Sequence, residues 1–99
     1  MQEIIYRLMS EGDIKQVAVI EKEIFSLPWS EKSFLDSLKN ENTVYIVAEI
    51  IDEIVAYCGA YISFEEADIS NVAVKKNFRR KNVAENMLNK LFYECGKKG

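Results

Sequence analysis

Histidine is absent from this chain of 99 residues, which also has only two cysteines, one proline and four glycines. The lack of histidine excludes the usual general base, the commonest metal ligand and every Ser-His or Cys-His nucleophilic site. Cys58 and Cys95 are too few for a disulfide framework, and without histidine they argue against a zinc site. Any chemistry must therefore rest on carboxylates, tyrosines, lysines or backbone amides, and we expect no metal.

Long apolar segments are lacking as well. No run approaches the roughly 18 apolar residues of a membrane-spanning helix, and the first residues lack the basic start and apolar stretch of a signal peptide. We therefore expect a cytoplasmic protein with reduced thiols and no membrane partner. The length predicts one small domain over residues 1–99, which would bury only about 60–65% of its unfolded surface.

Charge is distributed unevenly along the chain. Residues 1–74 hold 5 Lys and Arg against 14 Asp and Glu, whereas residues 75–99 hold 8 against 2, within a net charge of −3. Such asymmetry suggests that the C-terminal quarter faces an anion. On charge alone, the anion can be nucleic acid or a phosphorylated cofactor, and the quarter can also be a solvated helix with basic flanks.

Hydrophobic periodicity predicts four strands and three helices. The strands are expected at residues 4–8, 43–51, 54–62 and 67–74. The helices are expected to begin at Ile14, just after Ser30 and at Val83, the last one reaching to about Lys97. The order β-α-α-β-β-β-α predicts an α+β fold, in which helices cover the faces of an antiparallel meander.

Residue types at the helices add finer expectations. Asp13 can cap the first helix, whose solvent-facing side would carry Glu21. Ser30 can cap the second helix. The third helix would turn Phe92 inward, and Gly96 and Gly99 would end it. Cys58 is expected to be a small buried hydrophobe.

A basic loop precedes the third helix. Arg79, Arg80 and Lys81 stand just before Val83, where a helix N-terminus leaves about four backbone N–H groups without intrahelical partners. Together these groups form an anion cradle suited to a pyrophosphate. A basic loop before a helix can also be plain solvated surface, so the loop alone does not decide.

Two motifs carry a resemblance to a known family. NVAV at residues 71–74 is followed by NFRRKNVA at residues 77–84, where Arg79, Asn82 and Ala84 occupy the fixed places of the pattern Gln/Arg-x-x-Gly-x-Gly/Ala. This segment resembles the acetyl-CoA-binding motif of the GNAT N-acetyltransferases. FSLPWSEKSF at residues 25–34 resembles a segment of the family's ribosomal-protein-alanine N-acetyltransferases, and Glu66-Ala67 fits the same subfamily. The resemblance covers essentially the whole chain and implies the family's three-layer α/β fold.

The resemblance implies a site for acetyl-CoA. The backbone of the strand at residues 72–74 would hydrogen-bond the pantetheine arm as an added strand would, and the amides of residues 80–85 would bind the pyrophosphate. The implied cofactor-binding residues are Val72, Ala73, Val74, Arg79, Arg80, Lys81, Asn82, Val83, Ala84 and Glu85. In the subfamily, the segment containing Trp29 and Ser30 lies near the acceptor peptide. Trp29 could instead be a packing anchor beside a helix cap.

Asn82 departs from the family motif, which has glycine at this place. Glycine lets the backbone approach phosphate and adopt a positive φ without cost. Asparagine tolerates the left-handed conformation better than other residues do, but its side chain would crowd the phosphate. We therefore expect acetyl-CoA to bind, with a weaker affinity than glycine would give.

The resemblance also implies that residues 1–99 are the N-terminal portion of an incomplete domain. Family members continue past the position of Gly99 with further strands and a helix, which carry the subfamily's general base, a glutamate, and general acid, a tyrosine. No residue here matches either role. Asp68 is the remaining candidate, since some branches carry a catalytic carboxylate at the position it would match. Asp68 can also simply solvate the end of its strand.

Strand alternation gives two further expectations for residues 67–74. It would place Asp68, Val72 and Val74 on one face of the sheet. Because the continuing strand would be missing, this strand would form an unpaired edge, open to self-association or to pairing with another chain.

Three functions remain in view. The first, implied by the resemblance, is direct transfer of acetyl from acetyl-CoA to the N-terminal amine of a protein, such as a ribosomal protein that begins with alanine. The second is a non-catalytic or vestigial acetyl-CoA-binding module, so the sequence leaves open whether the chain is an enzyme. The third is a small nucleic-acid-binding domain, which is disfavoured because interleaved aromatics and an overall basic charge are lacking. We expect no DNA partner.

Overall fold

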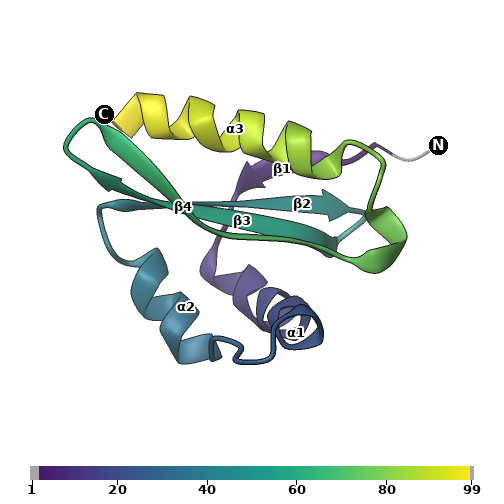
Figure 1. Ribbon diagram of the computed structural model, residues 1–99. Helices are drawn as coiled ribbons and strands as arrows, with labels where there is room; N and C mark the ends of the chain where they lie inside the picture. Colours follow the sequence, from purple (N-terminus) through teal and green to yellow (C-terminus); the bar gives the residue numbers. More distant parts are fainter. Residues whose placement is uncertain (1–2, 99) are drawn as a thin grey trace.

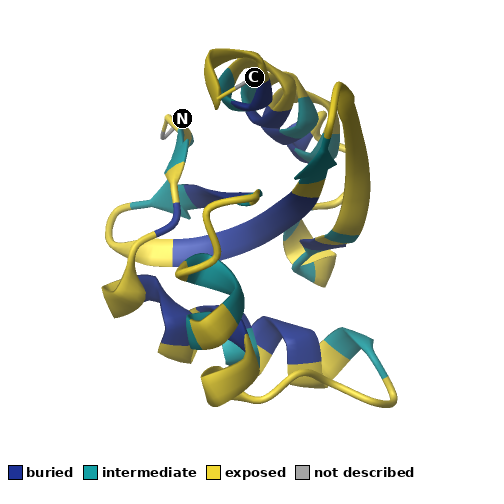
Figure 2. Cartoon of the chain, turned by 90° about the vertical axis from the view of Figure 1, so that its left-hand side faces the viewer, coloured by how far each residue is buried: buried dark blue, intermediate teal, exposed yellow. Residues whose placement is uncertain are grey.

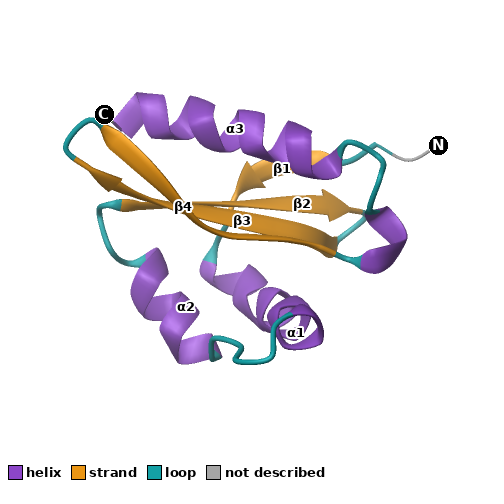
Figure 3. Ribbon diagram, in the orientation of Figure 1, coloured by secondary structure: helices purple, strands orange, loops and turns teal. Residues whose placement is uncertain are grey.

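One antiparallel sheet of four strands, in the order β1-β2-β3-β4, organises the structure. The computed structural model describes residues 3–98. The strands are β1 (Ile5–Leu8), β2 (Thr43–Ile50), β3 (Glu53–Ser63) and β4 (Glu66–Val74), and the helices are α1 (Ile14–Ile24), α2 (Glu31–Leu38) and α3 (Val83–Lys98). α3 covers one face of the sheet, and α1 and α2 cover the other (Figure 1; Figure 3). The predicted order β-α-α-β-β-β-α and the antiparallel meander are confirmed.

Tight turns join β2 to β3 and β3 to β4. Ile51 and Asp52 both have positive φ, of 41° and 64°, and connect Ile50 directly to its partner Glu53. Two positive φ values in a two-residue loop are characteristic of a type I′ hairpin, whose twist matches that of the strands. The strands expected from the sequence leave the polar pair Asp52-Glu53 between them as the turn. The observed turn at Ile51 and Asp52 lies one residue earlier.

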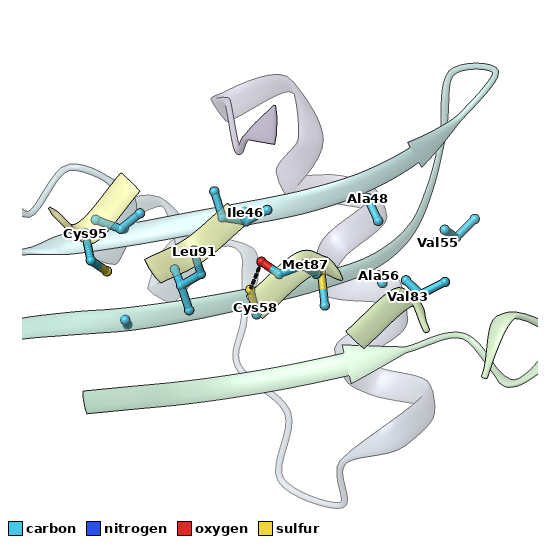
Figure 4. Close-up of a cluster of buried hydrophobic side chains, with 11 residues drawn as sticks. Ile46, Ala48, Val55, Ala56, Cys58, Val83, Met87, Leu91 and Cys95 are labelled. Carbon is cyan, nitrogen blue, oxygen red and sulfur yellow. Dashed lines mark hydrogen bonds between the residues drawn. The ribbon is translucent and has the colours of Figure 1, made fainter. Parts of the chain in front are cut away.

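The sheet separates two apolar clusters. The cluster under α3 joins Val83, Met87, Leu91 and Cys95 of the helix to small and branched residues of β2 and β3 (Figure 4). The cluster under α1 and α2 contains Phe34 of α2 and the residues Val17, Ile20, Tyr45, Tyr57 and Ala73. The middle strands are accordingly buried on both faces, whereas β4 is largely exposed (Figure 2).

One side chain of α3 differs from the sequence-based expectation. The helix passes through Gly96 and reaches Lys98, close to the end expected at about Lys97, but Phe92 is 51% exposed rather than turned inward. Cys95 packs inward in its place, because the buried stripe follows steps of four residues from Val83. Phe92 lies about 100° around the helix from Leu91 and so points away from the sheet.

Asp13 also has a different role from the expected one. It precedes α1 but makes no side-chain capping bond to that helix. Its carboxylate instead accepts hydrogen bonds from the Ser10 backbone N–H at 2.8 Å and from both terminal nitrogens of Arg7, at 2.7 and 2.9 Å. The Arg7 guanidinium holds the pKa of Asp13 below its usual value. Asp13 therefore ties β1 to the start of α1.

Candidate functional site

The loop between β4 and α3 folds back onto the end of the strand. Arg79 donates from Nε to the Val74 carbonyl at 3.0 Å, and a short 3-10 turn at Lys76–Phe78 precedes it. The first intrahelical bond of α3 runs from the Asn86 N–H to the Asn82 carbonyl at 3.0 Å. The amides of residues 83–85 precede that bond, so they are the free donors of the helix N-terminus.

Backbone conformation shapes the same loop. Arg80 and Asn82 have φ of 62° and 63°, and Lys81 between them is not among the residues with positive φ. Arg79 before them is extended, so the two left-handed residues turn the chain from the end of β4 into the start of α3. Asn82 thus adopts the left-handed conformation that makes glycine favourable at this motif position.

A surface pocket of about 310 Å³ lies at this loop. Of the expected cofactor residues, the structure brings together Val74, Arg79, Arg80, Asn82, Val83, Ala84 and Glu85 as its lining. Lys81 is not part of the lining, and its ammonium lies 5.7 Å from the centroid of the Phe78 ring. We call residues 79–85 the cradle. Its free amides, positive φ values and arginines fit a pyrophosphate group of the kind that acetyl-CoA carries.

β4 is an edge of the sheet formed by residues 3–98, since β3 is the only strand paired with it there. Along its other side, alternate backbone N–H and C=O groups point outward. Val72 is 37% exposed, whereas the side chain of Ala73 is buried under α1 and α2. The edge expected from the sequence is therefore present in the part of the chain that the structure describes.

A β-bulge at Ser70 overturns the expected common face of Asp68, Val72 and Val74. Gly59 pairs with Asn71 and Ala60 pairs with Ile69, so Ser70 has no partner and the alternation shifts there. Asp68 lies opposite Tyr61 on the face of α1 and α2, whereas Val72 and Val74 lie opposite Cys58 and Ala56 on the face of α3. Asp68 is exposed, and roughly 20 Å of strand separates it from the cradle end of β4.

The segment between α1 and α2, residues 25–30, contains Trp29 and Ser30. Ser30 caps α2 as expected, since its Oγ accepts a hydrogen bond from the Ser33 N–H at 3.1 Å. Trp29 packs against Phe34 with ring centroids 5.3 Å apart. Both residues also line a surface pocket of about 530 Å³ beside the outer side of α1. Trp29 is thus a packing anchor, and it is also placed at a concave surface.

Aromatic contacts connect this segment with β4. Phe34 meets Tyr57 edge to face with ring centroids 5.6 Å apart. Tyr57 pairs with Ala73 of β4 in the sheet register. The structure therefore brings the Trp29 segment toward Ala73, near the cradle end of the strand expected to bind the pantetheine arm, and leaves Asp68 near the other end of that strand.

Glu21 is a buried residue that the sequence reading assigned to the solvent-facing side of α1. It is only 2% exposed, and its carboxylate accepts hydrogen bonds from the Tyr57 hydroxyl and from the Trp29 N–H. Burial, followed by the neighbouring carboxylate, raises the pKa of Tyr57 well above its usual value, so its hydroxyl stays a donor. The sequence could have indicated this burial, because Glu21 shares one helix face with apolar residues. Steps of three and four residues connect Ile14, Val17, Glu21 and Ile24.

Among residues 3–98, no group of three or more Cys, Asp or Glu side chains is placed to hold a metal ion. No helix in that range is both long and apolar enough to traverse a lipid bilayer.

Comparison with known proteins gives a consistent set of relatives. Residues 14–99 match the model of the acetyltransferase (GNAT) family. The chain is 32% identical over 93 residues to a Bacillus subtilis protein named as a candidate ribosomal protein bS18-alanine N-acetyltransferase. This alignment covers 93% of the chain and 62% of the Bacillus protein. It is 26% identical over 92 residues to the ribosomal protein bS18-alanine N-acetyltransferase of Salmonella typhimurium, with the same coverage of 93% and 62%. The chain thus spans 62% of the length of these relatives.

Solved structures share the fold. The ribosomal-protein-S18-alanine N-acetyltransferase of Escherichia coli has a TM-score of 0.84 and 23% identity, covering 98% of the chain and 62% of that structure. The PaiA N-acetyltransferase of Thermoplasma acidophilum, solved in complex with coenzyme A, has a TM-score of 0.86 and 14% identity, covering 98% and 74%. At these identities the likeness establishes the fold alone.

Proposed function

Because the chain belongs to the GNAT acetyltransferase family, we propose that it binds acetyl-CoA at the cradle and takes part in acetylating the N-terminal amine of a protein. The conformation of the cradle carries this proposal. Arg80 and Asn82 hold left-handed backbone between the end of β4 and the start of α3, where the family motif has its glycine. A ribosomal protein beginning with alanine is the proposed acceptor, in line with the names of the relatives, and the cytoplasm is the proposed location.

Two parts of the molecule would share the binding of acetyl-CoA. The cradle would bind the pyrophosphate through backbone amides and arginine charge, and the open edge of β4 would align the pantetheine arm by strand-like hydrogen bonds. Bound acetyl-CoA supplies a thioester, whose carbonyl carbon accepts the amine. The C–N bond forms as the C–S bond breaks, the amine loses a proton to a base and the sulfur leaves as a thiolate.

Asp68 is the carboxylate proposed for the base in this chain. It lies on the same sheet face as α1, α2 and the Trp29 segment, which favours the acceptor side. If it takes the proton, Asp68→Asn lowers the rate constant kcat by roughly 100-fold or more without weakening acetyl-CoA binding. An unchanged kcat assigns Asp68 to solvation of the strand.

Calorimetric titration with acetyl-CoA tests the cofactor site. Arg80→Glu reverses a charge in the pocket and is expected to weaken binding by about tenfold or more. Lys39→Glu makes the same charge change at an exposed position at the end of α2, and serves as the matched control. No binding at millimolar acetyl-CoA, or equal loss in both variants, contradicts the proposed site.

A thiol-release assay with a peptide that begins with alanine tests the transfer. Release of thiol that requires both the peptide and acetyl-CoA supports acetyl transfer. Acetyl-CoA binding without thiol release supports the second candidate instead, a non-catalytic binding module. That candidate is favoured by the exposure of Asp68, which can simply solvate the end of its strand.

A further inference from the structure

Glu21 is a buried carboxylate whose two hydrogen-bond donors are both neutral. Its Oε2 accepts from the Trp29 N–H at 3.0 Å, and its Oε1 accepts from the Tyr57 hydroxyl. In the part of the chain that the structure describes, the ion pairs involve other carboxylates. Burying a charge without a cation costs free energy that an apolar side chain would avoid. A carboxylate at this position therefore needs a reason other than packing.

The two oxygens of Glu21 provide that reason. A carboxylate accepts hydrogen bonds at both oxygens, whereas glutamine of the same shape offers one acceptor and one NH₂ donor. Glutamine could accept from the Trp29 N–H and turn its NH₂ toward the Tyr57 hydroxyl, which would then have to accept. Methionine has a similar volume but offers neither oxygen, so it leaves both donors without an acceptor. Glu21 therefore joins a strand and a loop through two bonds that an apolar side chain cannot make.

The loop contact of Glu21 lies in a segment with few other attachments. Residues 25–30 form neither helix nor strand, and Leu27 is 89% exposed. Apart from the ring contact of Trp29 with Phe34, the bond from the Trp29 N–H to Glu21 fixes the middle of the segment. Through Tyr57, the same carboxylate is joined to β3 opposite Ala73 of β4.

We propose that Glu21 is a positioning residue that holds the Trp29 segment against the sheet and thereby sets affinity for an acceptor peptide. The part of this proposal that concerns the acceptor rests on the function proposed above. Glu21 does not receive the proton of the amine, since both of its oxygens already accept bonds inside the protein. Its effect is on where the segment lies relative to β4.

Fluorescence provides a test that needs no substrate, because Trp29 is the one tryptophan in the chain. Glu21→Met is expected to raise the acrylamide quenching constant of Trp29 by about twofold, since the Trp29 N–H loses its acceptor. Glu23→Met makes the same change on the exposed side of α1 and should leave quenching unaltered. Unchanged quenching in a folded Glu21→Met protein overturns the proposal.

Binding measurements separate positioning from general destabilisation. Glu21→Met is expected to weaken binding of a peptide that begins with alanine by roughly fivefold or more, with acetyl-CoA affinity changed less than about twofold. In the transfer assay, KM for the peptide should rise while kcat stays constant. Parallel loss of both affinities overturns the proposal. Absence of peptide binding by the unmodified protein refutes the proposed function instead, and the quenching comparison still judges the role of Glu21.

Amide hydrogen exchange covers the case in which Glu21→Met fails to fold. In the unmodified chain, the Trp29 N–H should exchange at least about tenfold more slowly than the Leu27 N–H, because only the former is bonded to the carboxylate. Equal exchange rates for the two amides overturn the proposal.

Discussion

Arg7 connects two carboxylates from different elements, and its replacement by methionine gives a sharp test of this structure. Its Nη1 and Nη2 donate to Asp13 at 2.7 and 2.9 Å, and its Nε donates to Glu49 of β2 at 2.9 Å. The exposed side-chain fractions are 34% for Arg7, 9% for Asp13 and 18% for Glu49. Arg7→Met keeps the apolar stem but leaves a nearly buried carboxylate without its cation.

The expected cost follows from this partial burial. Removing one partner of a buried ion pair costs about 3–5 kcal/mol, whereas exposed pairs contribute about 0.2–1 kcal/mol. Since Arg7 is about a third exposed, we expect the free energy of unfolding to fall by about 2 kcal/mol. For a chain of this size that corresponds to a lower melting temperature by about 8–16 °C. Lys15→Met, which removes an exposed cation from α1, should cost less than about 0.5 kcal/mol.

The pH dependence of the free energy of unfolding provides a second test of the same prediction. The pKa of Asp13 is lowered chiefly by its hydrogen bond to Arg7, so Asp13 stabilises the fold above its unfolded pKa of about 3.9. That stabilisation is lost as the pH falls through the lowered, folded-state pKa. Without Arg7, burial raises the pKa of Asp13 and only the hydrogen bonds from Ser10 still lower it, so the loss should begin at a higher pH. Urea unfolding from pH 7 to pH 3, in a double-mutant cycle with Asp13→Asn, measures both effects. A coupling energy below about 0.5 kcal/mol would refute the reasoning.

Three further predictions concern α3 and its surroundings. Leu91→Ala should reduce the free energy of unfolding by about 2–5 kcal/mol, because Leu91 is fully buried under the helix. Phe92→Ala should reduce it by less than about 1 kcal/mol. Equal reductions for the two variants in thermal unfolding would contradict the assigned helix face. Asn82→Gly should tighten acetyl-CoA binding, since glycine adopts the positive φ without a side chain near the phosphate; unchanged affinity in calorimetry would disprove the crowding explanation. Burial raises the pKa of the Cys58 thiol to about 12, so a disulfide reagent at pH 8 should modify it only in denaturant, and rapid native reaction would show that the cluster under α3 opens.

Periodicity predicted the elements because each of them presents one side to a core. The alternating residues of β2 and β3 and the apolar steps of α1 and α3 are direct consequences of burial against a sheet. Boundaries moved by one or two residues, and the turn at Ile51 and Asp52 moved because positive φ, rather than polarity, decides a two-residue hairpin. Local patterns cannot reveal the bulge at Ser70, since the shift in pairing depends on Gly59 and Ala60 of the neighbouring strand.

The candidate site was predictable where its chemistry is local. The cradle is a contiguous stretch, and the left-handed conformation at Asn82 follows from the motif position that it occupies. The left-handed conformation of Arg80 was not predicted, because arginine has no preference for it. Contacts among Glu21, Trp29 and Tyr57 depend on residues up to 36 positions apart, so the sequence alone could not separate a solvated glutamate from a buried one.

The two misassigned carboxylates reveal how differently the helices are attached to the sheet. Asp13 joins the start of α1 to β1 through Arg7, and Glu21 joins the last turns of α1 to β3 through Tyr57. α3 is attached chiefly by buried apolar side chains that include Leu91. Hydrogen bonds and ion pairs fix direction, whereas apolar packing tolerates substitutions that conserve volume. The position of the Trp29 segment should therefore depend on a few specific polar groups. The position of the cradle should depend on the summed volume of the side chains packed under α3.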